Sequence, residues 1–387
     1  MPVVKVSRRG ADRLKGGHVW VYRSDLVSAN GIAPGAAVGV RDEPGKFLGT
    51  ALYSSASQIA IRMISREAVA DLPALLRERI QQAIAYRDWV VCDTDAFRVA
   101  FSEADFLPGL IVDRYGDVLS LQVLTQAMDA DPIRQTVVSE LVQQFKPTSI
   151  VERVDPRIRE LEQLPPRASS LLQGDKASTV VTMNGVKFHY DALEGQKTGA
   201  FLDQRENYAA AARYAHGEAL DVFCYQGGFA LHLAKPCSSV TGVDSSRPAL
   251  EMAERNASLN GREIEWIEAN AFDLLRDYAA SGRQYDTIVL DPPAFAKSRR
   301  NLETALRGYK ELNLRALKML RPGGILVTCS CSYHVRPTEF LEVVGSAAQD
   351  SHRIVRVMEN LTQAKDHPIL LTVPETAYLK CIVSYVT

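Results

Sequence analysis

No stretch of this sequence is apolar enough to cross a membrane. No window of its 387 residues approaches the 18 consecutive apolar residues that a bilayer-spanning helix needs. The first residues, MPVVKVSRRG, lack the apolar region and the small-residue cleavage site of a secretory signal peptide. We therefore expect a soluble, cytoplasmic protein without a membrane partner.

Cysteine is scarce and irregularly spaced. The chain has six cysteines, whereas small disulfide-rich domains carry many at close, regular spacing. Reduced thiols therefore fit better, and a cysteine with a special role would be catalytic or metal-binding. Neither a CxxC pair nor a matching histidine cluster accompanies Cys329 and Cys331, so we expect no metal site.

Net charge is low, at −1, but it is unevenly distributed. Residues 1–66 contain ten Lys and Arg against four Asp and Glu, so this part carries +6 and the remainder −7. Such a basic segment is typical of a polyanion-binding surface, although an ordinary basic face without a partner has the same composition.

The length and the 46% apolar content predict two or three domains. Residues 1–68 are short apolar strands separated by turns, which predicts a small β-barrel. Residues 69–190 predict a small α+β domain, with helical spacing from Leu72 to Val90 and from Pro132 to about Phe145. The polar run from Pro165 to Asp175 predicts a loop.

Residues 191–387 alternate strands with helices. Because the strands are mostly apolar, they predict a parallel sheet that helices cover on both faces. Two closing strands, RIVRVM and AYLKCIVSYV, predict an antiparallel hairpin at one edge. A sheet of this kind binds its ligands at the carboxyl ends of the strands.

Polar residues follow the first four of these strands. Asp221 ends the first strand, and the turn Cys224 to Gly228 lets the backbone approach a ligand, although it is not a GxGxxG motif. Asp244 ends the second strand, where a carboxylate can bind ribose hydroxyls. Asn270, whose amide could read an adenine edge, follows the third, and Asp291-Pro292-Pro293 follows the fourth. Each feature alone also fits an ordinary loop, but the ordered set favours S-adenosylmethionine over NAD.

Several long strings are more specific than these strand ends. They are GQKTGAFLDQRENY (Gly195 to Tyr208), DVFCYQGGFAL, VDSS, DPPAFAKS, RGYKELNLRALKML and TCSCS, with GHVWVY, SEADFLPGLIVDRYGD and KDHPILLTVPETAYLKC elsewhere. Together they resemble the RlmI-like ribosomal RNA methyltransferases, which make 5-methylcytosine in large-subunit RNA. Position 19 departs from that pattern, because Val19 stands where proline is common.

The resemblance spans the chain and implies an α/β fold class. A Rossmann-like, seven-stranded class I methyltransferase domain (191–387) would follow a PUA-type RNA-binding β-barrel (1–68) and the central α+β domain (69–190). It implies S-adenosylmethionine as cofactor and large-subunit ribosomal RNA as partner, and it leaves a homodimer open. The implied cofactor-binding residues are Arg205, Asp221, Phe223, Tyr225, Gly227, Gly228, Asp244, Ser245, Asn270, Ala271 and Asp291.

The segment from Lys197 to Arg205 is implied to fold over the cofactor. Arg205 could pair with the cofactor carboxylate, and a structural pair with Asp203 is the alternative. A target base must be unpaired or flipped out to reach a pocket at a sheet edge, and backbone contacts would offset that cost. Candidates for these RNA contacts are Arg8, Arg9, Arg13, Lys15, Arg23 and Arg62, with Phe295, Trp20 and Tyr22 as stacking or core residues.

Methylation of cytosine C5 requires a nucleophile on the enzyme. Because C5 attacks a sulfonium methyl group poorly, a thiolate must first add at C6. Cys331 follows the fifth parallel strand, beside the strand that leads to Asp291, and it matches the nucleophile position of the family. Asp291 would accept from the cytosine N4 amine or share a proton with N3. Cys329 lies two residues earlier and deeper in the sheet, and a buried structural role is the alternative for either thiol.

Two questions stay open at this point. Many RNA cytosine-C5 enzymes carry a second cysteine after the prolines, but this chain has Ala294 there, so water, Cys329 or Lys297 are the candidates for removing the C5 proton. The alternative functions are a methyltransferase acting on a base nitrogen and a catalytically inactive RNA-binding assembly factor.

Overall fold

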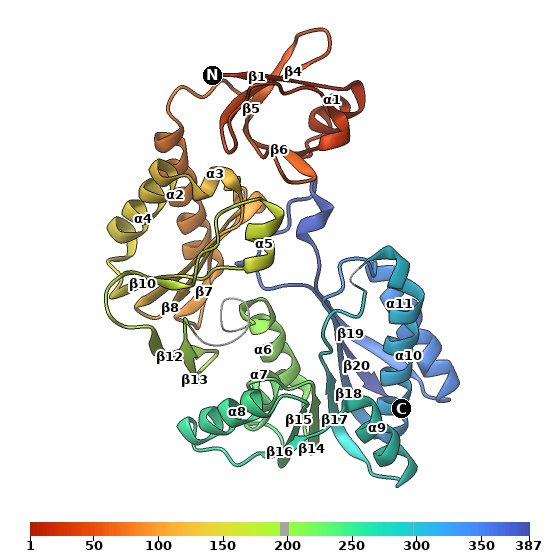
Figure 1. The fold of residues 1–387 in the computed structure, drawn as a ribbon. Helices are drawn as coiled ribbons and strands as arrows, with labels where there is room; N and C mark the ends of the chain where they lie inside the picture. Colours follow the sequence, from red (N-terminus) through yellow and green to blue (C-terminus); the bar gives the residue numbers. More distant parts are fainter. Residues whose placement is uncertain (194–200, 297) are drawn as a thin grey trace. The chain divides into compact units, whose positions relative to one another are not determined.

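A computed structural model describes residues 1–193, 201–296 and 298–387. The chain forms two compact units (Figure 1). The first contains Met1–Val181 and Lys365–Thr376, and the second contains Thr182–His189, Phe201–Ala364 and Ala377–Thr387. Among the helices that the structure describes, none is long and apolar enough to span a membrane.

The amino-terminal part of the first unit is a six-stranded sheet in the order β2-β6-β5-β4-β1-β3. Its strands are β1 (Val3–Val6), β2 (Trp20–Tyr22), β3 (Leu26–Ser28), β4 (Ala37–Asp42), β5 (Phe47–Tyr53) and β6 (Ile59–Ser65). Alternate residues such as Val4, Val6 and Val38 form its core. Helix α1 (Arg8–Lys15) was not predicted from the sequence. Ser7 caps the amino terminus of this helix, because its hydroxyl accepts from the Gly10 amide.

A second sheet, in the order β11-β10-β9-β8-β7, follows in the same unit. Its strands are β7 (Ala96–Phe101), β8 (Leu110–Tyr115), β9 (Val118–Val123), β10 (Ser149–Glu152) and β11 (Ser170–Gln173). Its helices are α2 (Leu72–Val90), α3 (Gln126–Asp129), α4 (Asp131–Phe145) and α5 (Pro156–Leu161), of which α2 and α4 match the predicted helices. The prediction of a loop from Pro165 to Asp175 is wrong at β11, where the chain forms a strand. That edge strand is mostly exposed, so its sequence shows no apolar alternation.

A buried arginine ties the segment Lys365–Thr376 to this unit. The side chain of Arg87 on α2 is fully buried and makes a two-pronged ion pair with Asp105. It also donates to the backbone carbonyl of Asp366, whose carboxylate in turn accepts from the amide of Arg98. From the sequence we expected this segment in the carboxyl-terminal domain. Its contacts with Arg87 and Arg98 could not be predicted, because contacts so distant along the chain leave no local pattern.

The second unit is built on a seven-stranded sheet in the order β16-β15-β14-β17-β18-β20-β19. Its strands are β14 (Glu218–Val222), β15 (Ser239–Asp244), β16 (Glu265–Glu268), β17 (Tyr285–Leu290), β18 (Leu320–Ser330), β19 (Val355–Leu361) and β20 (Lys380–Val386). All neighbours are parallel except β20, which is antiparallel to both β18 and β19. The predicted α/β sheet and its edge hairpin are confirmed.

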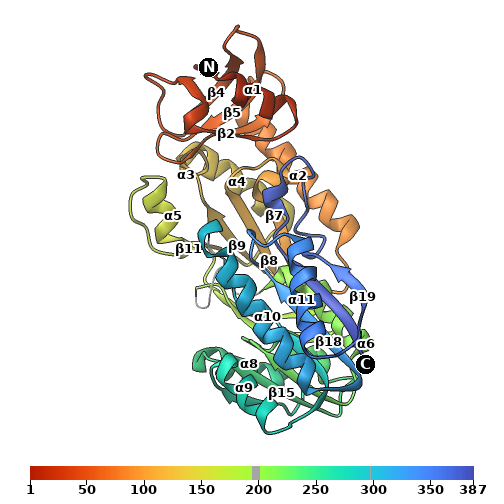
Figure 2. The ribbon, with the colours of Figure 1, turned by 90° about the vertical axis from the view of Figure 1, so that its right-hand side faces the viewer.

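Helices cover both faces of this sheet (Figures 1 and 2). They are α6 (Arg205–Tyr214), α7 (Gly228–Leu233), α8 (Arg247–Leu259), α9 (Ala271–Ala280), α10 (Leu302–Met319) and α11 (Pro337–Asp350). Leu220 and Ile288 pack toward α9, α10 and α11, whereas Ala219 and Val289 pack toward α6 and α7. Residues of opposite parity thus fill opposite cores, as alternation along a strand requires. The chain also forms a two-stranded sheet of β12 (Ser178–Met183) and β13 (Val186–Asp191).

The ion pair of Arg87 leads to a stability prediction. Arg87→Ala leaves the carboxylate of Asp105 buried without its guanidinium, so we expect a loss of about 3 to 5 kcal/mol in the free energy of unfolding. Arg77→Ala, on the exposed face of the same helix, is the matched control and should change stability by less than about 0.5 kcal/mol. Urea unfolding followed by circular dichroism measures both, and equal effects of the two variants would contradict the prediction.

Candidate active site

Four neighbouring strands end at one edge of the seven-stranded sheet of the second unit. Strand order reverses beside β14, because β15 and β16 lie on one side of it and β17 and β18 on the other. Val222 is in register with Val243 of β15 and with Leu290 of β17, and Leu290 is in register with Thr328 of β18. The residues after these strands therefore meet where an open α/β sheet binds its ligands.

The turn after β14 is locked to the end of β15. The Tyr225 amide donates to Oδ2 of Asp244 at 2.9 Å, and the Ser246 amide donates to Oδ1 at 2.9 Å. Phe223, Tyr225 and Gly227 all have positive φ, at 68°, 50° and 86°. Two non-glycine residues in this sparsely populated region are typical of a loop whose shape serves a ligand.

Gly228 begins α7 under a close contact. A Cβ atom at this position would lie 2.5 Å from the ring of Tyr208, so a larger residue would push the helix away from α6. The glycine is thus required both for the packing of α7 and for the approach of its amino terminus to the site.

Asp221 is a fully buried carboxyl group at the same strand end. Its Oδ2 accepts from the Ala230 amide at 2.8 Å, while its Oδ1 has no hydrogen-bond partner among the described residues. Burial raises the pKa of Asp221 to about 8, and the charges of Asp291 and Asp244 act in the same direction. A buried oxygen that lacks a partner is costly unless a ligand supplies a donor.

These groups fit the predicted cofactor. S-adenosylmethionine carries an ammonium group, a sulfonium centre and a ribose diol, which suit a site with three carboxyl groups and a glycine turn. Asn270 fits only in part, because its Oδ1 already caps α9 by accepting from the amides of Phe272 and Asp273. We expected the Asn270 amide to bind an adenine edge through one donor and one acceptor, but only its donor is left for that contact. Ser245 is exposed after Asp244, and Ala271 is buried as the first residue of α9.

The other predicted cofactor contacts lie around α6. Arg205 is 1% exposed and pairs with Glu206 at 3.7 Å, whereas the Asp203 carboxylate accepts from the Tyr378 hydroxyl at 2.6 Å. The ring of Tyr225 meets the edge of Phe201 at a centroid distance of 5.1 Å. Residues 194–200, which include the first four residues of the segment predicted to cover the cofactor, lie outside the described residues.

Cys331 follows β18 directly and is partly exposed. Its Sγ donates to the carbonyl oxygen of Pro292 at 3.9 Å, so the thiol meets the loop that begins with Asp291. Cys329 differs, because its side chain is fully buried opposite Cys381 and burial raises its pKa well above the usual value. The expected greater depth of Cys329 is confirmed.

Gln204 was not among the predicted site residues. Its Nε2 donates to Oδ1 of Asp291 at 2.9 Å, and its Oε1 accepts from Asn207 at 2.7 Å. The bond from Asn207 fixes which end of the Gln204 amide faces the carboxylate. The signal was available, because Gln204 is part of the string that carries the family resemblance.

Lys380 was also missed. It is only 6% exposed, and its Nζ donates to the carbonyl oxygens of Ser332 at 2.7 Å and Tyr378 at 2.8 Å. Burial lowers the pKa of Lys380 to about 8, although the charges of Cys331 and Glu339 oppose the shift. A lysine within the apolar strand AYLKCIVSYV was the available signal, since lysine is almost never fully buried without a reason.

A hydroxyl network supports the residues after β18. The Ser332 hydroxyl lies 2.9 Å from the Tyr309 hydroxyl, which accepts from Ser330 at 3.0 Å. The amide of Ala296 also donates to the Ser332 hydroxyl, at 3.2 Å. The network therefore links β18, α10 and the loop after β17. Phe295 packs against Tyr309 at 4.8 Å between centroids, in the core role that the sequence left open.

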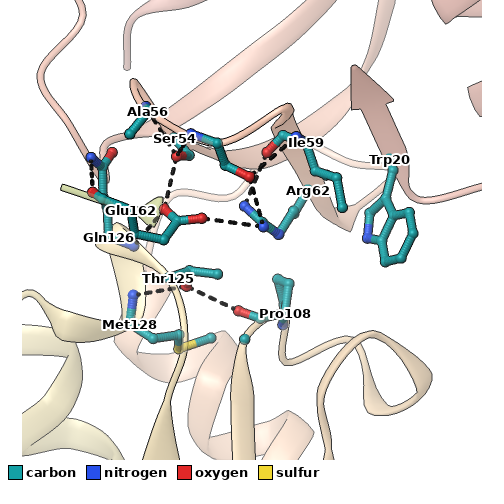
Figure 3. Close-up of polar contacts among 12 residues, drawn as sticks. Trp20, Ser54, Ala56, Ile59, Arg62, Pro108, Thr125, Gln126, Met128 and Glu162 are labelled. Atoms are coloured by element: carbon teal, nitrogen blue, oxygen red, sulfur yellow. Dashed lines mark hydrogen bonds and ion pairs between the residues drawn. The ribbon is translucent and has the colours of Figure 1, made fainter. Parts of the chain in front are cut away.

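Two of the predicted RNA contacts are engaged inside the first unit. The guanidinium of Arg62 pairs with Glu103. It also pairs with Glu162, which accepts from Ser54 (Figure 3). Arg23 donates to the backbone carbonyls of Ser54 and Ser57. We therefore remove Arg62 and Arg23 from the set of phosphate contacts, because their donors already hold the protein together.

The remaining basic candidates lie on α1. The side chains of Arg8, Arg9 and Lys15 are 94%, 69% and 48% exposed, although each has an acidic neighbour within 4 Å. Trp20 is partly buried and donates from Nε1 to Glu103 at 3.0 Å, and the Arg13 guanidinium lies over the ring of Tyr22. Lys297 lies outside the described residues.

Comparison with known proteins agrees with this geometry. Residues 4–66 match the model of a PUA-like domain, and residues 155–381 match that of an S-adenosylmethionine-dependent methyltransferase. The chain is 40% identical over 382 residues to "Ribosomal RNA large subunit methyltransferase I" of Shewanella denitrificans, with 95% of each chain covered. The protein of the same name in Photobacterium profundum is 38% identical over 383 residues, again with 95% of each covered.

Solved structures share the fold over the whole chain. A SAM-dependent methyltransferase from Streptococcus mutans aligns over 100% of both chains with a TM-score of 0.84 at 19% identity. A methyltransferase solved in complex with SAH aligns equally fully, with a TM-score of 0.85 and 19% identity. The chain therefore belongs to the family of S-adenosylmethionine-dependent methyltransferases that includes these ribosomal RNA large subunit methyltransferases I, with a PUA-like domain at its amino terminus and S-adenosylmethionine as its cofactor.

Proposed function

We propose that this protein methylates carbon 5 of a cytosine in large-subunit ribosomal RNA, with Cys331 as the covalent nucleophile. The observation that carries the proposal is the contact between the Cys331 thiol and the Pro292 carbonyl, which joins a partly exposed thiol to the Asp291 loop. The names of the relatives supply the class of RNA. The PUA-like domain supports an RNA substrate.

The reaction starts at the cysteine. The Cys331 thiolate adds to C6 of the cytosine, so a C–S bond forms and the electron pair of the C5–C6 double bond makes C5 nucleophilic. S-adenosylmethionine, when bound, supplies the electrophilic methyl group that C5 takes. Loss of the C5 proton then restores the double bond and expels the Cys331 thiolate.

Asp291 assists the addition step. Its carboxyl group would accept from the N4 amine or share a proton with N3, and either interaction stabilises the charge that develops on the ring. Gln204 holds Oδ1 of Asp291, and Asn207 fixes the Gln204 amide in turn. This chain of hydrogen bonds gives the carboxyl group a set direction before the base arrives.

Burial reduces the number of candidates for the base that removes the C5 proton. Cys329 would need to be a thiolate to accept the proton, but full burial disfavours that form and the side chain is not exposed to the site. Water and Lys297 are left from the three original candidates.

The packing of Phe295 favours carbon over nitrogen methylation. In enzymes that methylate exocyclic amines, the aromatic residue after the prolines stacks on the target base. Here Ala294 intervenes and the ring of Phe295 packs between Phe272 and Tyr309. A thiol at the end of β18 has no role in nitrogen methylation, whereas carbon methylation depends on it.

The amino-terminal helix contributes to RNA binding in this proposal. Arg8 and its partner Asp12 are both exposed, and an exposed ion pair contributes little stability, so a phosphate can replace Asp12 at low cost. Arg9 and Lys15 are exposed but pair with the buried carboxylates of Asp25 and Asp42, so they would bind phosphate while keeping these partners. Backbone contacts of this kind give affinity without sequence preference. We therefore assign α1 to backbone binding and the Asp291 loop to base recognition.

Removal of the nucleophile gives a direct test. Cys331→Ala should reduce methyl transfer to ribosomal RNA by roughly 1,000-fold or more, because no other described thiol can take its position. Cys92→Ala, at an exposed position in the first unit, is the control and should keep full activity. Methyl transfer is measured with labelled cofactor, and nucleoside mass spectrometry should identify the product as 5-methylcytidine. Full activity of Cys331→Ala would end the covalent mechanism, and an N-methylated product would end the assignment to C5.

A trapped adduct tests the same step without turnover. RNA that contains 5-fluorocytidine has no C5 proton to lose, so the C–S bond should persist and shift the protein on a denaturing gel. The shift should require the cofactor and should disappear in Cys331→Ala but persist in Cys92→Ala. A shift that survives in Cys331→Ala would identify a different nucleophile.

Cofactor binding tests the role of Asp244. Asp244→Ala removes an acceptor for the ribose, the acceptor for the Tyr225 amide in the turn after β14 and the acceptor for the Ser246 amide after β15, so we expect S-adenosylhomocysteine to bind about 10 to 100-fold more weakly. Asp273→Ala, an exposed carboxylate on α9, should leave the affinity unchanged. Isothermal titration calorimetry measures both dissociation constants, and unchanged binding by Asp244→Ala would remove this residue from the cofactor site.

A further inference from the structure

Lys380 is a buried cation that stability does not explain. Burying an ammonium group is costly unless a carboxylate pairs with it, and none of the described carboxylates lies within ion-pair distance of its Nζ. Its two hydrogen bonds go to neutral backbone carbonyls, those of Ser332 and Tyr378. An apolar residue would fill the strand at lower cost, so the charge itself calls for an explanation.

Strand pairing brings this cation beside the nucleophile. Lys380 is in register with Ser330 of β18, one residue before Cys331, and it donates to the carbonyl of Ser332, one residue after Cys331. The ammonium group therefore holds the backbone directly after the thiol, while the pairing of β18 with β20 holds the backbone directly before it. A negative charge on Cys331 acts on Lys380 by raising its pKa. Because this electrostatic coupling is reciprocal, the ammonium charge favours the thiolate to the same extent.

We propose that the ammonium group of Lys380 keeps Cys331 in its thiolate form and holds the backbone around it in position for attack. Lys380 is thus a positioning residue for the reaction, acting through the cysteine and not on the RNA. The inference rests on the proposed function only for its biological meaning, since the coupling between the two side chains is measurable without any RNA.

The other ionisable groups around this pair do not replace Lys380. Glu339 on α11 is negative and is itself paired with Arg336. Asp291 carries the same sign as a thiolate and disfavours it, while burial keeps the phenol of Tyr309 and the thiol of Cys329 neutral by raising the pKa of each. Apart from Arg336, which is paired with Glu339, Lys380 alone among these described groups carries a positive charge.

The pH dependence of alkylation tests the proposal. Only the thiolate reacts with iodoacetamide, so the rate of modification of Cys331, followed by peptide mass spectrometry, reports its ionised fraction. In Lys380→Met the midpoint of this profile should move up by about one pH unit, which lowers the rate at pH 7 by about 10-fold. The rates of variant and wild type should converge at high pH, where the thiol is ionised in both.

Two further variants define the control and the rescue. Lys318→Met removes an exposed lysine from α10 and should leave the profile unchanged. Lys380→Arg keeps a positive charge and should recover part of the shift, which a purely structural role would not predict. A profile for Lys380→Met that matches the wild type, in protein with an unchanged unfolding midpoint, would overturn the proposal.

A reciprocal titration covers the case in which Lys380→Met does not fold. The Lys380 side chain can be titrated by NMR in wild-type protein and in Cys331→Ala, without any change to the lysine. Loss of the thiolate should lower the titration midpoint of Lys380, because the cysteine charge supports its protonated form. An identical midpoint in both proteins would overturn the proposal. If Cys331→Ala keeps full methyltransferase activity while the midpoint does shift, the coupling stands and the proposed function falls.

Discussion

The register of the parallel strands around β14 is the constraint on which the site depends. Asp221, Asp291 and Cys331 belong to segments far apart in sequence, and only the alignment of β14, β17 and β18 brings their strand ends to one edge. A slip of one residue in any of these strands would turn its side chains to the opposite face. The two cores that cover the sheet prevent such a slip, because each accepts residues of one parity only. The apolar packing therefore fixes the geometry of the polar groups.

Burial gives these polar groups their chemistry. Asp221 and Lys380 both have pKa values shifted to about 8, in opposite directions from their usual values, and desolvation is the first cause in each case. The charges of Asp291 and Asp244 disfavour the ionised form of Asp221, which makes the strand ends suited to a cationic ligand such as a sulfonium. Lys380 lies on β20, beside the Cys331 thiol. One edge of the sheet thus carries three acidic groups together with a buried cation beside the Cys331 thiol.

The sequence predicted the second unit more fully than the first. Its central strands β14, β17, β18 and β20 are largely buried, so their apolar runs are clear and the strand ends with Asp244 and Asp291 could be found directly. Helix α1 and strand β11 were missed because they are short and largely exposed. The roles of Gln204 and Lys380 could not be read from periodicity either. Gln204 bonds to Asp291, 87 residues further along the chain, and Lys380 bonds to Ser332, 48 residues before it, so no local pattern reports these contacts.

Arg23 and Arg62 show why a count of charged residues overestimates the number of cations that can bind RNA. The excess of positive residues at the amino terminus includes Arg23 and Arg62, whose donors are used within the first unit. Arg23 donates to backbone carbonyls, and Glu162, an acidic partner of Arg62, lies outside the segment that was counted, so the net charge of that segment overstated the cations available to phosphate. Each phosphate contact contributes to the dependence of affinity on salt, and only an exposed cation can displace counterions from RNA. The number of usable contacts is therefore set by burial and pairing, which only the fold determines.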